Sequence, residues 1–235
     1  MRLDAYLVKN LFSDSRTKAQ NIIKDGFVSV NGKVITKSAY KLEEQDSVEI
    51  KEHKVYVSRS AHKLKSFLEE LDLDLTSMVG LDIGASTGGF TQILLEYGVK
   101  EVSAVDVGTN QLHKTLRADD RVISYESCDI REFESKKIFD IVVSDVAFIS
   151  LHHILDDIDR LASKNIILLF KPQFEVGKEV KRDKHGVVLD KKAIDRAMIK
   201  FEDATKLKNW KLIKKSASKL SGKEGNVEYC YYYEK

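Results

Sequence analysis

Residues 81–90 read LDIGASTGGF, a short apolar run followed by a turn rich in glycine. Because glycine lacks a side chain, Gly84, Gly88 and Gly89 let the backbone turn sharply and approach a ligand closely. The run before the turn is expected to be a strand, and the segment GFTQILLEYG after it a helix. The stretch therefore predicts the first strand-to-helix turn of an α/β sheet, which is where such sheets bind their ligands.

Downstream of this turn, expected strands and helices alternate along the rest of the chain. The further strands are expected at EVSAVDVG, RVISYE, FDIVVSDV and NIILLF, with helices at QLHKTLRAD and LHHILDDIDRLA. A long helix, LDKKAIDRAMIKFEDATKL, and two alternating strands, KLIKKSA and NVEYCYYYE, follow. This order predicts a Rossmann-like, doubly wound α/β sheet with helices on both faces and an antiparallel pair of strands at its end.

Two acids that follow the next two expected strands complete a candidate nucleotide pocket. Asp106 comes about 22 residues after Gly84, where an acid can bind the two hydroxyls of a ribose. Asp129 follows the third strand, where it can accept a hydrogen bond from an adenine amino group. The spacing favours S-adenosylmethionine; a dinucleotide, or a plain helix-capping role for the acids, is the alternative. The residues expected at the cofactor are Gly84, Ala85, Ser86, Thr87, Gly88, Gly89, Asp106 and Asp129.

A lysine stands at the end of another expected strand. Lys171 follows the apolar run Ile166–Phe170 and precedes Pro172, the only proline in the chain. A charge at the mouth of a buried strand is costly unless something needs it. Proline also biases the residue before it towards an extended conformation, which would fix the direction of the lysine. Lys171 is therefore a candidate functional residue.

Three further polar residues belong with this lysine. Asp145 ends the strand in FDIVVSDV, and Glu228 lies in the last strand, in NVEYCYYYE. Lys63 falls beside the apolar stripe of an expected helix that Ser60 would cap. Because strand ends meet at one rim of a sheet, we expect Asp145, Lys171 and Glu228 to converge there.

This arrangement resembles the FtsJ-type ribose 2′-O-methyltransferases, which use a Lys-Asp-Lys-Glu tetrad. The motifs RSAHKL, LDIGASTGGF, AVDVGTNQL, SDVAFISL, KPQFEVG, GVV and GNVEY follow in order along residues 59–229. They are similar to those of one subfamily, the TlyA (haemolysin A) family of rRNA methyltransferases. The resemblance implies methylation of the cytidine 2′-hydroxyl in ribosomal RNA, with S-adenosylmethionine as cofactor and ribosomal RNA or ribosomal subunits as partners.

The resemblance implies a catalytic tetrad of Lys63, Asp145, Lys171 and Glu228. A ribose hydroxyl is a poor nucleophile, so its methylation needs a base and an aligned methyl donor. We expect Lys171 to be the base, with Lys63 orienting it and favouring its neutral form, and the two acids to hold the lysines. Two positions depart from the family pattern, because Ser60 stands in place of the usual glycine and Asp129 in place of the usual asparagine.

The first 52 residues predict a separate, basic unit. Two expected helices, the second capped by Ser13, Asp14 or Ser15, precede a hairpin centred on Asn31-Gly32. Residues 1–41 carry eight Lys or Arg against three Asp, which favours a polyanionic partner; a solvated basic face is the alternative.

The stretches Arg2-Leu3-Asp4, Ser15–Ala19 and Gly26–Gly32 are similar to the S4 RNA-binding domain, a small α+β fold. This resemblance implies that the unit contacts structured RNA through its basic residues. The expected RNA contacts are Arg2, Arg16 and Lys18, with Lys181 and Arg182 as further candidates for which solvent exposure is an equal alternative. The expected organisation is an S4-like domain at 1–53, a linker at 54–58 and a methyltransferase domain at 59–235.

Several other classes of protein are disfavoured. Two cysteines, Cys128 and Cys230, cannot form a disulfide framework, and MRLDAYLVKN lacks the apolar core of a signal peptide. No apolar run approaches the roughly 18 residues that span a bilayer. These three observations lead us to expect a cytoplasmic enzyme. No cluster of side chains has metal-ligand spacing, so we expect no metal site. A membrane-active haemolysin and a non-catalytic RNA-binding protein on a methyltransferase fold stay as alternatives.

Overall fold

The computed structural model describes residues 1–10, 12–13, 15–24, 26–51 and 56–235. The chain divides into two compact units, residues 1–55 and 56–235. The expected linker at 54–58 begins within residues 52–55, which lie outside the described part of the chain. Asp14, one of the three candidate helix caps, also lies outside it.

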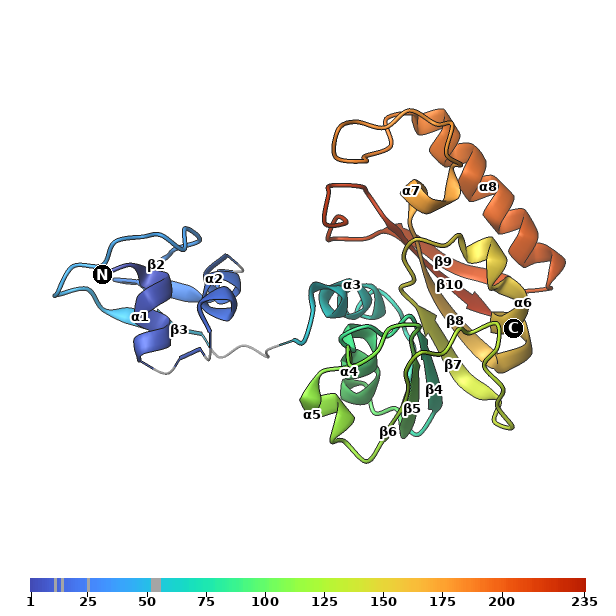
Figure 1. The fold of residues 1–235 in the computed structure, drawn as a ribbon, viewed down its shortest axis with the longest axis horizontal. Coiled ribbons are helices and arrows are strands. Elements are labelled where there is room, and N and C mark those ends of the chain that lie inside the picture. The colour runs from blue at the N-terminus through green and yellow to red at the C-terminus, as the bar shows by residue number, and fades with distance from the viewer. Residues whose placement is uncertain (11, 14, 25, 52–55) are drawn as a thin grey trace. The chain divides into compact units, whose positions relative to one another are not determined.

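The small unit combines two helices with a three-stranded sheet (Figure 1). Its elements are α1 (Leu3–Lys9), α2 (Arg16–Lys24), β1 (Val28–Val30), β2 (Lys33–Val34) and β3 (Val48–Ile50). Strand β1 is central and pairs antiparallel with both neighbours. The Ser15 hydroxyl accepts a hydrogen bond of 3.3 Å from the Lys18 backbone amide, as an N-cap does.

The predicted hairpin of the small unit is confirmed. Asn31 and Gly32 have φ values of 51° and 76°, and a two-residue type I′ turn requires positive φ at both positions. Leu3, Ile23 and Val28 are fully buried in one apolar cluster that the helices share with the sheet. The polar faces of both helices are therefore left at the surface.

The large unit is built on a seven-stranded sheet with the order β6-β5-β4-β7-β8-β10-β9 (Figure 1). The strands are β4 (Val79–Ile83), β5 (Glu101–Val105), β6 (Val122–Tyr125), β7 (Phe139–Ser144), β8 (Ala162–Phe170), β9 (Lys211–Ala217) and β10 (Tyr229–Glu234). Strands β4 to β8 pair in parallel, whereas β10 runs antiparallel to both β8 and β9. The carboxyl ends of the parallel strands therefore lie at one edge of the sheet, and β10 begins at that same edge.

Helices cover both faces of this sheet (Figure 1). Ile167 and Leu169 of β8 pack with α3 (Arg59–Leu68) and α4 (Gly89–Glu96). The alternate residues Ile166 and Leu168 pack with α6 (Leu155–Leu161) and α8 (Lys191–Leu207). Because successive side chains of a strand point to opposite faces, the two helical layers lie on opposite sides of the sheet. The predicted fold, a doubly wound α/β sheet preceded by a small S4 domain, is confirmed.

Three local predictions were wrong. The helix expected at QLHKTLRAD is the four-residue α5 (Lys114–Arg117), which the His113 side chain caps. The helix expected at LHHILDDIDRLA begins with a 3₁₀ turn, η1 (Leu151–His153), and α6 follows it. The residue before α3 is Ser58, not Ser60, and the two hydroxyl oxygens are 2.6 Å apart. The remaining helix, α7 (Pro172–Glu175), has proline at its first position, where no hydrogen bond is lost.

Candidate active site

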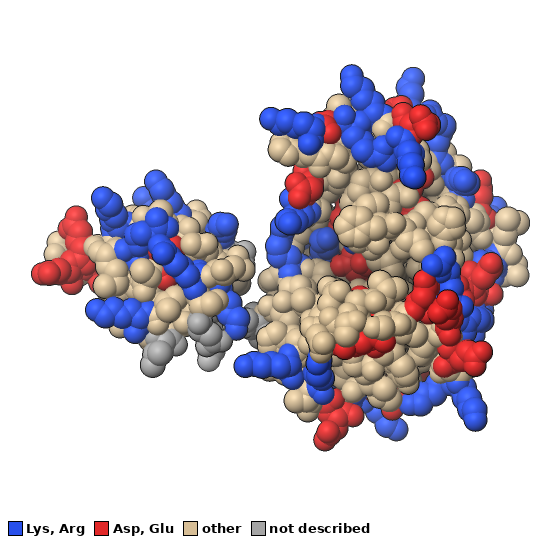
Figure 2. All heavy atoms as spheres, in the orientation of Figure 1, with Lys and Arg blue, Asp and Glu red and all other residues tan. Residues whose placement is uncertain are grey.

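A cavity of about 670 Å³ opens at the carboxyl ends of β4, β5, β7 and β8. Residues of the glycine turn, of the other strand ends and of α3 line it, including Gly84, Asp106, Asp145 and Lys171. On the face seen in Figure 2, the large unit is hollowed, with acidic atoms inside the hollow and basic side chains along one side. A crevice outside the carboxyl ends of the strands is where doubly wound sheets bind nucleotides.

The glycine turn shapes one wall of this cavity. Gly84 has a φ of 77°, and a Cβ there would lie 3.2 Å from the Val146 Cα, so this close approach requires glycine. The backbone amides of Ser86 and Gly108 donate to the two oxygens of Asp106, at 2.8 Å and 2.6 Å. Ala85 and Thr87 also line the cavity. The turn and the predicted ribose acid therefore form one hydrogen-bonded unit.

The other two glycines of the motif have packing roles. A Cβ on Gly88 would lie 2.3 Å from the Leu116 side chain, and one on Gly89 would lie 2.1 Å from the Ser60 hydroxyl. Gly88 and Gly89 thus let the start of α4 pack against its neighbours. The structure gives them a role in positioning the turn rather than in lining the cavity.

Asp129 lies in the loop that follows β6 and lines the cavity, and an arginine holds it there. Arg131 Nη2 lies 2.5 Å from Asp129 Oδ2, and Arg131 Nε donates to Oδ1 at 2.9 Å. The hydrogen bonds from the Arg131 side chain lower the pKa of Asp129 to about 2, so the carboxylate is charged at neutral pH. Arg131 therefore compensates the negative charge that Asp129 adds at a position where the family pattern has asparagine.

One acid in the cavity was missed from the sequence. Asp82 on β4 is fully buried, and its Oδ2 accepts hydrogen bonds from the amide and hydroxyl of Thr91. Its Oδ1 has no hydrogen-bonding partner among the described residues. Burial raises the pKa of Asp82 to about 7, with Asp145 and Asp106 as nearby negative charges. An acid inside the apolar run VGLDI was the signal that could have found it.

The four predicted tetrad residues form two ion pairs. Lys63 Nζ lies 2.6 Å from Glu228 Oε2, and both side chains are buried. Lys171 Nζ lies 2.6 Å from Asp145 Oδ1 and donates to the Asp145 backbone carbonyl at 3.2 Å. The structure therefore brings the four residues together, and it buries Lys63, which the sequence placed beside the apolar stripe of its helix.

Strand pairing explains how these residues meet. Tyr229 of β10 pairs with Phe170 of β8, so Glu228 and Lys171 leave adjacent strands at the same edge. Gln173, which the sequence did not single out, donates to Glu228 at 3.4 Å from α7. Cys230 of β10, two residues after Glu228, is buried, and burial raises its pKa to about 12, so it stays a thiol.

A loop held by α7 forms the outer wall of the cavity. Glu175 accepts hydrogen bonds from the Ser150 hydroxyl at 2.5 Å and from the Leu151 amide at 2.8 Å. Phe148 in this loop has a φ of 65°, which is strained for a bulky residue, and is 91% exposed. Its ring lies 5.4 Å from that of Phe174, so an apolar platform stands at the mouth of the cavity.

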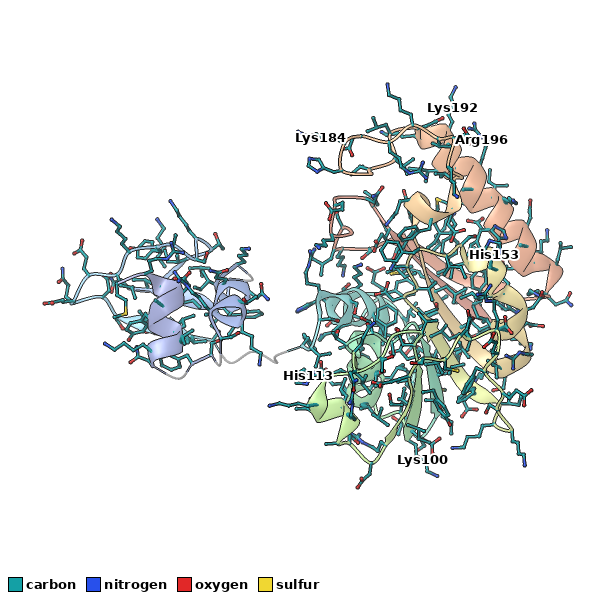
Figure 3. All side chains as sticks on the ribbon, in the orientation of Figure 1. Lys100, His113, His153, Lys184, Lys192 and Arg196 are labelled. Atoms are coloured by element: carbon teal, nitrogen blue, oxygen red, sulfur yellow. The ribbon has the colours of Figure 1, made fainter. Side chains whose placement is uncertain are left out.

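The predicted RNA contacts have different surroundings. In the small unit, Arg2 and Arg16 both pair with the buried Asp4, and Lys18 is exposed on α2. In the large unit, Lys181 is exposed, whereas the Arg182 guanidinium donates to four backbone carbonyls, those of Gln173, Gly177, Lys178 and Val180. These contacts favour a role for Arg182 in holding the loop rather than in binding RNA. Lys184 points outward from the same loop (Figure 3).

Comparison with known proteins agrees with this fold. Residues 56–235 match the FtsJ-like methyltransferase family, and residues 1–48 match the S4 domain. The sheet and the cavity at its carboxyl edge thus define a methyltransferase-class domain joined to an S4 domain. The chain belongs to the TlyA family of FtsJ-like methyltransferases, as its full-length relatives show.

Three relatives illustrate this membership. The 23S rRNA (cytidine-2′-O)-methyltransferase TlyA of Campylobacter jejuni is 46% identical, and the alignment covers 99% of both chains. Hemolysin A of Brachyspira hyodysenteriae is 37% identical over 99% of both chains. A solved structure of a haemolysin-named protein from Streptococcus thermophilus is 33% identical, with a TM-score of 0.74 over 100% of this chain and 88% of that one. Within the described residues, no helix is long and apolar enough to cross a membrane.

Proposed function

We propose that this protein transfers a methyl group from S-adenosylmethionine to the 2′-hydroxyl of a cytidine in ribosomal RNA. One observation carries the proposal: two lysine–carboxylate pairs with buried lysines stand at one end of a cavity whose other end is lined by Asp106 and Asp129. The end with the lysines suits removal of a proton from the substrate, and the end with the two acids suits binding of a nucleoside. The name of the Campylobacter relative supports cytidine as the target.

The residues around the cavity suit S-adenosylmethionine. Asp106 is held by backbone amides with its carboxylate at the cavity, where it would bind the ribose hydroxyls. Asp129 would accept from the adenine amino group. The unpartnered Oδ1 of Asp82 would accept from the ammonium of the methionine part. A volume of about 670 Å³ is in the range of small-molecule sites.

In the proposed mechanism, Lys171 removes the hydroxyl proton. When bound, S-adenosylmethionine supplies an electrophilic methyl group on a sulfonium, which is a good leaving group. Asp145 fixes Lys171 through the 2.6 Å contact, so the amine is held at the reacting end of the cavity. Glu228 holds Lys63 in the same cavity wall, through the 2.6 Å contact between their side chains.

The substrate side of the cavity supports an RNA target. Phe148 offers an exposed ring at the cavity mouth, on which an unstacked base could pack. Arg59 and Lys223 line the same cavity, and such cations suit backbone phosphates. The S4 domain would add affinity for structured RNA, with its basic residues on the phosphates.

The test is transfer of a labelled methyl group from S-adenosylmethionine to ribosomal RNA and to ribosomal subunits. We expect Lys171→Ala to lower the rate by about 10²- to 10⁴-fold, the usual contribution of a proton-transfer group, with RNA binding unchanged. The matched control is Lys164→Ala, which removes an exposed lysine from the same strand.

Each failure has a distinct meaning. Equal transfer by wild type and Lys171→Ala would remove Lys171 from the mechanism. Absence of transfer to every ribosomal substrate would sink the proposed function. Leakage of washed liposomes at low protein concentration would instead support the lytic activity named in the Brachyspira relative.

A further inference from the structure

We propose that Asp4 of the small unit is a positioning residue that holds Arg2 and Arg16 as a paired clamp for backbone phosphates of structured RNA. The inference rests on the proposed function, which requires an RNA substrate. It concerns a carboxylate distant in sequence from the methyltransferase residues, on the first helix of the S4 domain.

The geometry is that of two guanidinium groups on one carboxylate. Arg2 binds both oxygens of Asp4, through Nε at 3.0 Å and Nη2 at 2.8 Å. Arg16 donates to the same two oxygens, through Nε at 3.2 Å and Nη2 at 3.5 Å. A forked pair of this kind fixes the plane of the guanidinium as well as its position. Asp4 therefore sets the direction of both arginines.

The carboxylate is hidden while the cations are open. The Asp4 side chain is fully buried, whereas the side chains of Arg2 and Arg16 are 45% and 57% exposed. Gln20 adds a further hydrogen bond to Asp4 at 3.0 Å. The hydrogen bonds from Arg2 are the main cause that holds the pKa of Asp4 well below its usual value, so the group stays ionised. Only the arginines can meet a ligand.

The charges in the cluster are unbalanced in favour of an anion. Two guanidinium groups share one carboxylate, so the cluster carries a net positive charge. Within the described part of the chain, neither Nη1 has a hydrogen-bonding partner. Guanidinium matches the geometry of phosphate oxygens and can bind two at once. The small unit has lysine and arginine side chains over the visible face around its helices, which suits the same class of ligand (Figure 2).

The backbone fixes both arginines at places where the chain is constrained. Arg2 has extended dihedral angles and pairs with Lys41 in an isolated antiparallel bridge. Arg16 is the first residue of α2. Asp4 lies on α1, so its contact with Arg16 also joins the two helices. A contact that only joined the two helices would need Arg16 alone, whereas a phosphate clamp needs both arginines.

The clamp predicts that loss of the Asp4 charge weakens RNA binding, whereas simple electrostatics predicts that it strengthens binding. Asp4→Asn removes a negative charge, so a long-range Coulomb effect alone would tighten RNA binding. Loss of the forked contacts frees both arginines, and we expect the dissociation constant to rise, on the order of 10-fold. Glu44→Gln is the matched control, because it removes an exposed acid of the same unit without touching the cluster. This control should bind as wild type or slightly tighter.

The experiment measures binding of the full-length variants to a fluorescent hairpin of ribosomal RNA, with melting temperature recorded for each. A cycle with Arg2→Ala/Arg16→Ala shows whether Asp4 acts through the arginines. We expect Asp4→Asn to have no further effect on binding in that background. A purely structural role would lower the melting temperature without this dependence.

The outcomes separate the clamp from the proposed function. A folded Asp4→Asn protein that binds RNA as tightly as wild type, or more tightly, overturns the clamp alone. If Asp4→Asn does not fold, the charge-preserving variants Arg2→Lys and Arg16→Lys decide, because unweakened binding by both overturns the clamp. Wild-type protein that binds no RNA overturns the proposed function, and the clamp with it.

Discussion

The protein has two clusters in which basic side chains pair with carboxylates, and the two clusters lie in different environments. In the cavity, each lysine has its own carboxylate, and both lysines are buried. In the small unit, two half-exposed arginines share one buried carboxylate. A balanced, buried pair is little screened by salt and suits a fixed catalytic geometry. An unbalanced, open cluster keeps a net charge at the surface and suits the binding of an anion.

The largest test of this contrast breaks one buried pair. Glu228→Gln leaves Lys63 buried without its counter-charge, and losing one partner of a buried pair costs about 3–5 kcal/mol. We expect methyl transfer to fall by about 100-fold and the urea midpoint to fall with it. Assays of transfer and of urea unfolding on the same protein measure both effects.

A second substitution then separates stability from function. Lys63→Met together with Glu228→Gln removes both charges, so the stability should recover while methyl transfer stays low. Recovery of both would mean that the pair is structural. The corresponding loss of Asp4 in the small unit should leave methyl transfer at saturating RNA unchanged, since that cluster lies outside the cavity.

The next test concerns Asp82, an acid with no cation beside it. Its folded pKa of about 7 lies above the unfolded value of 3.8, because burial disfavours the charge. The folded state therefore binds the extra proton, so this contribution to stability is present at low pH and is lost as pH rises from about 4 to about 7.

Asp82→Asn should remove that pH dependence. The wild type should lose free energy of unfolding, on the order of a few kcal/mol, between pH 4 and pH 7, and the variant should not. Urea unfolding at several pH values measures the slope, with the exposed Asp195→Asn as control. Equal slopes in wild type and Asp82→Asn would show that Asp82 does not titrate in this range.

The sequence predicted which four polar residues meet in the cavity better than it predicted their surroundings. Lys171 stood out because a charge followed a buried strand and preceded the only proline. The burial of Lys63 was not predicted, since its partner Glu228 lies 165 residues away. The hold of Asp4 on Arg16 was also missed, because the contact joins two helices whose packing no local pattern fixes. Periodicity predicts which face of an element is apolar, but the pairing of single polar groups depends on tertiary structure.

The fold was predictable because its main elements depend on local sequence patterns. Alternating apolar runs and the glycine turn at Gly84 depend on local chemistry, and these elements formed as expected. Short connecting helices such as α5 were not, because a few capping contacts decide their length. Asp82 was overlooked although its place inside the apolar run VGLDI was a local signal that the acid is buried.

The smallest expected effect is that of salt on the methyl-transfer rate at saturating RNA, and it gives the sharpest comparison of the two clusters. Two phosphate contacts at the arginines would weaken RNA binding by about 10-fold between 50 and 200 mM salt, and further basic residues would add to this. Methyl transfer at saturating RNA should change by less than about 2-fold, because the buried pairs of the cavity are little screened. Binding and single-turnover rates measured across the same salt series check both. A rate that falls as steeply as the affinity would mean that the tetrad is open to solvent when RNA is bound, and the distinction between a buried catalytic cluster and an open binding cluster would fail.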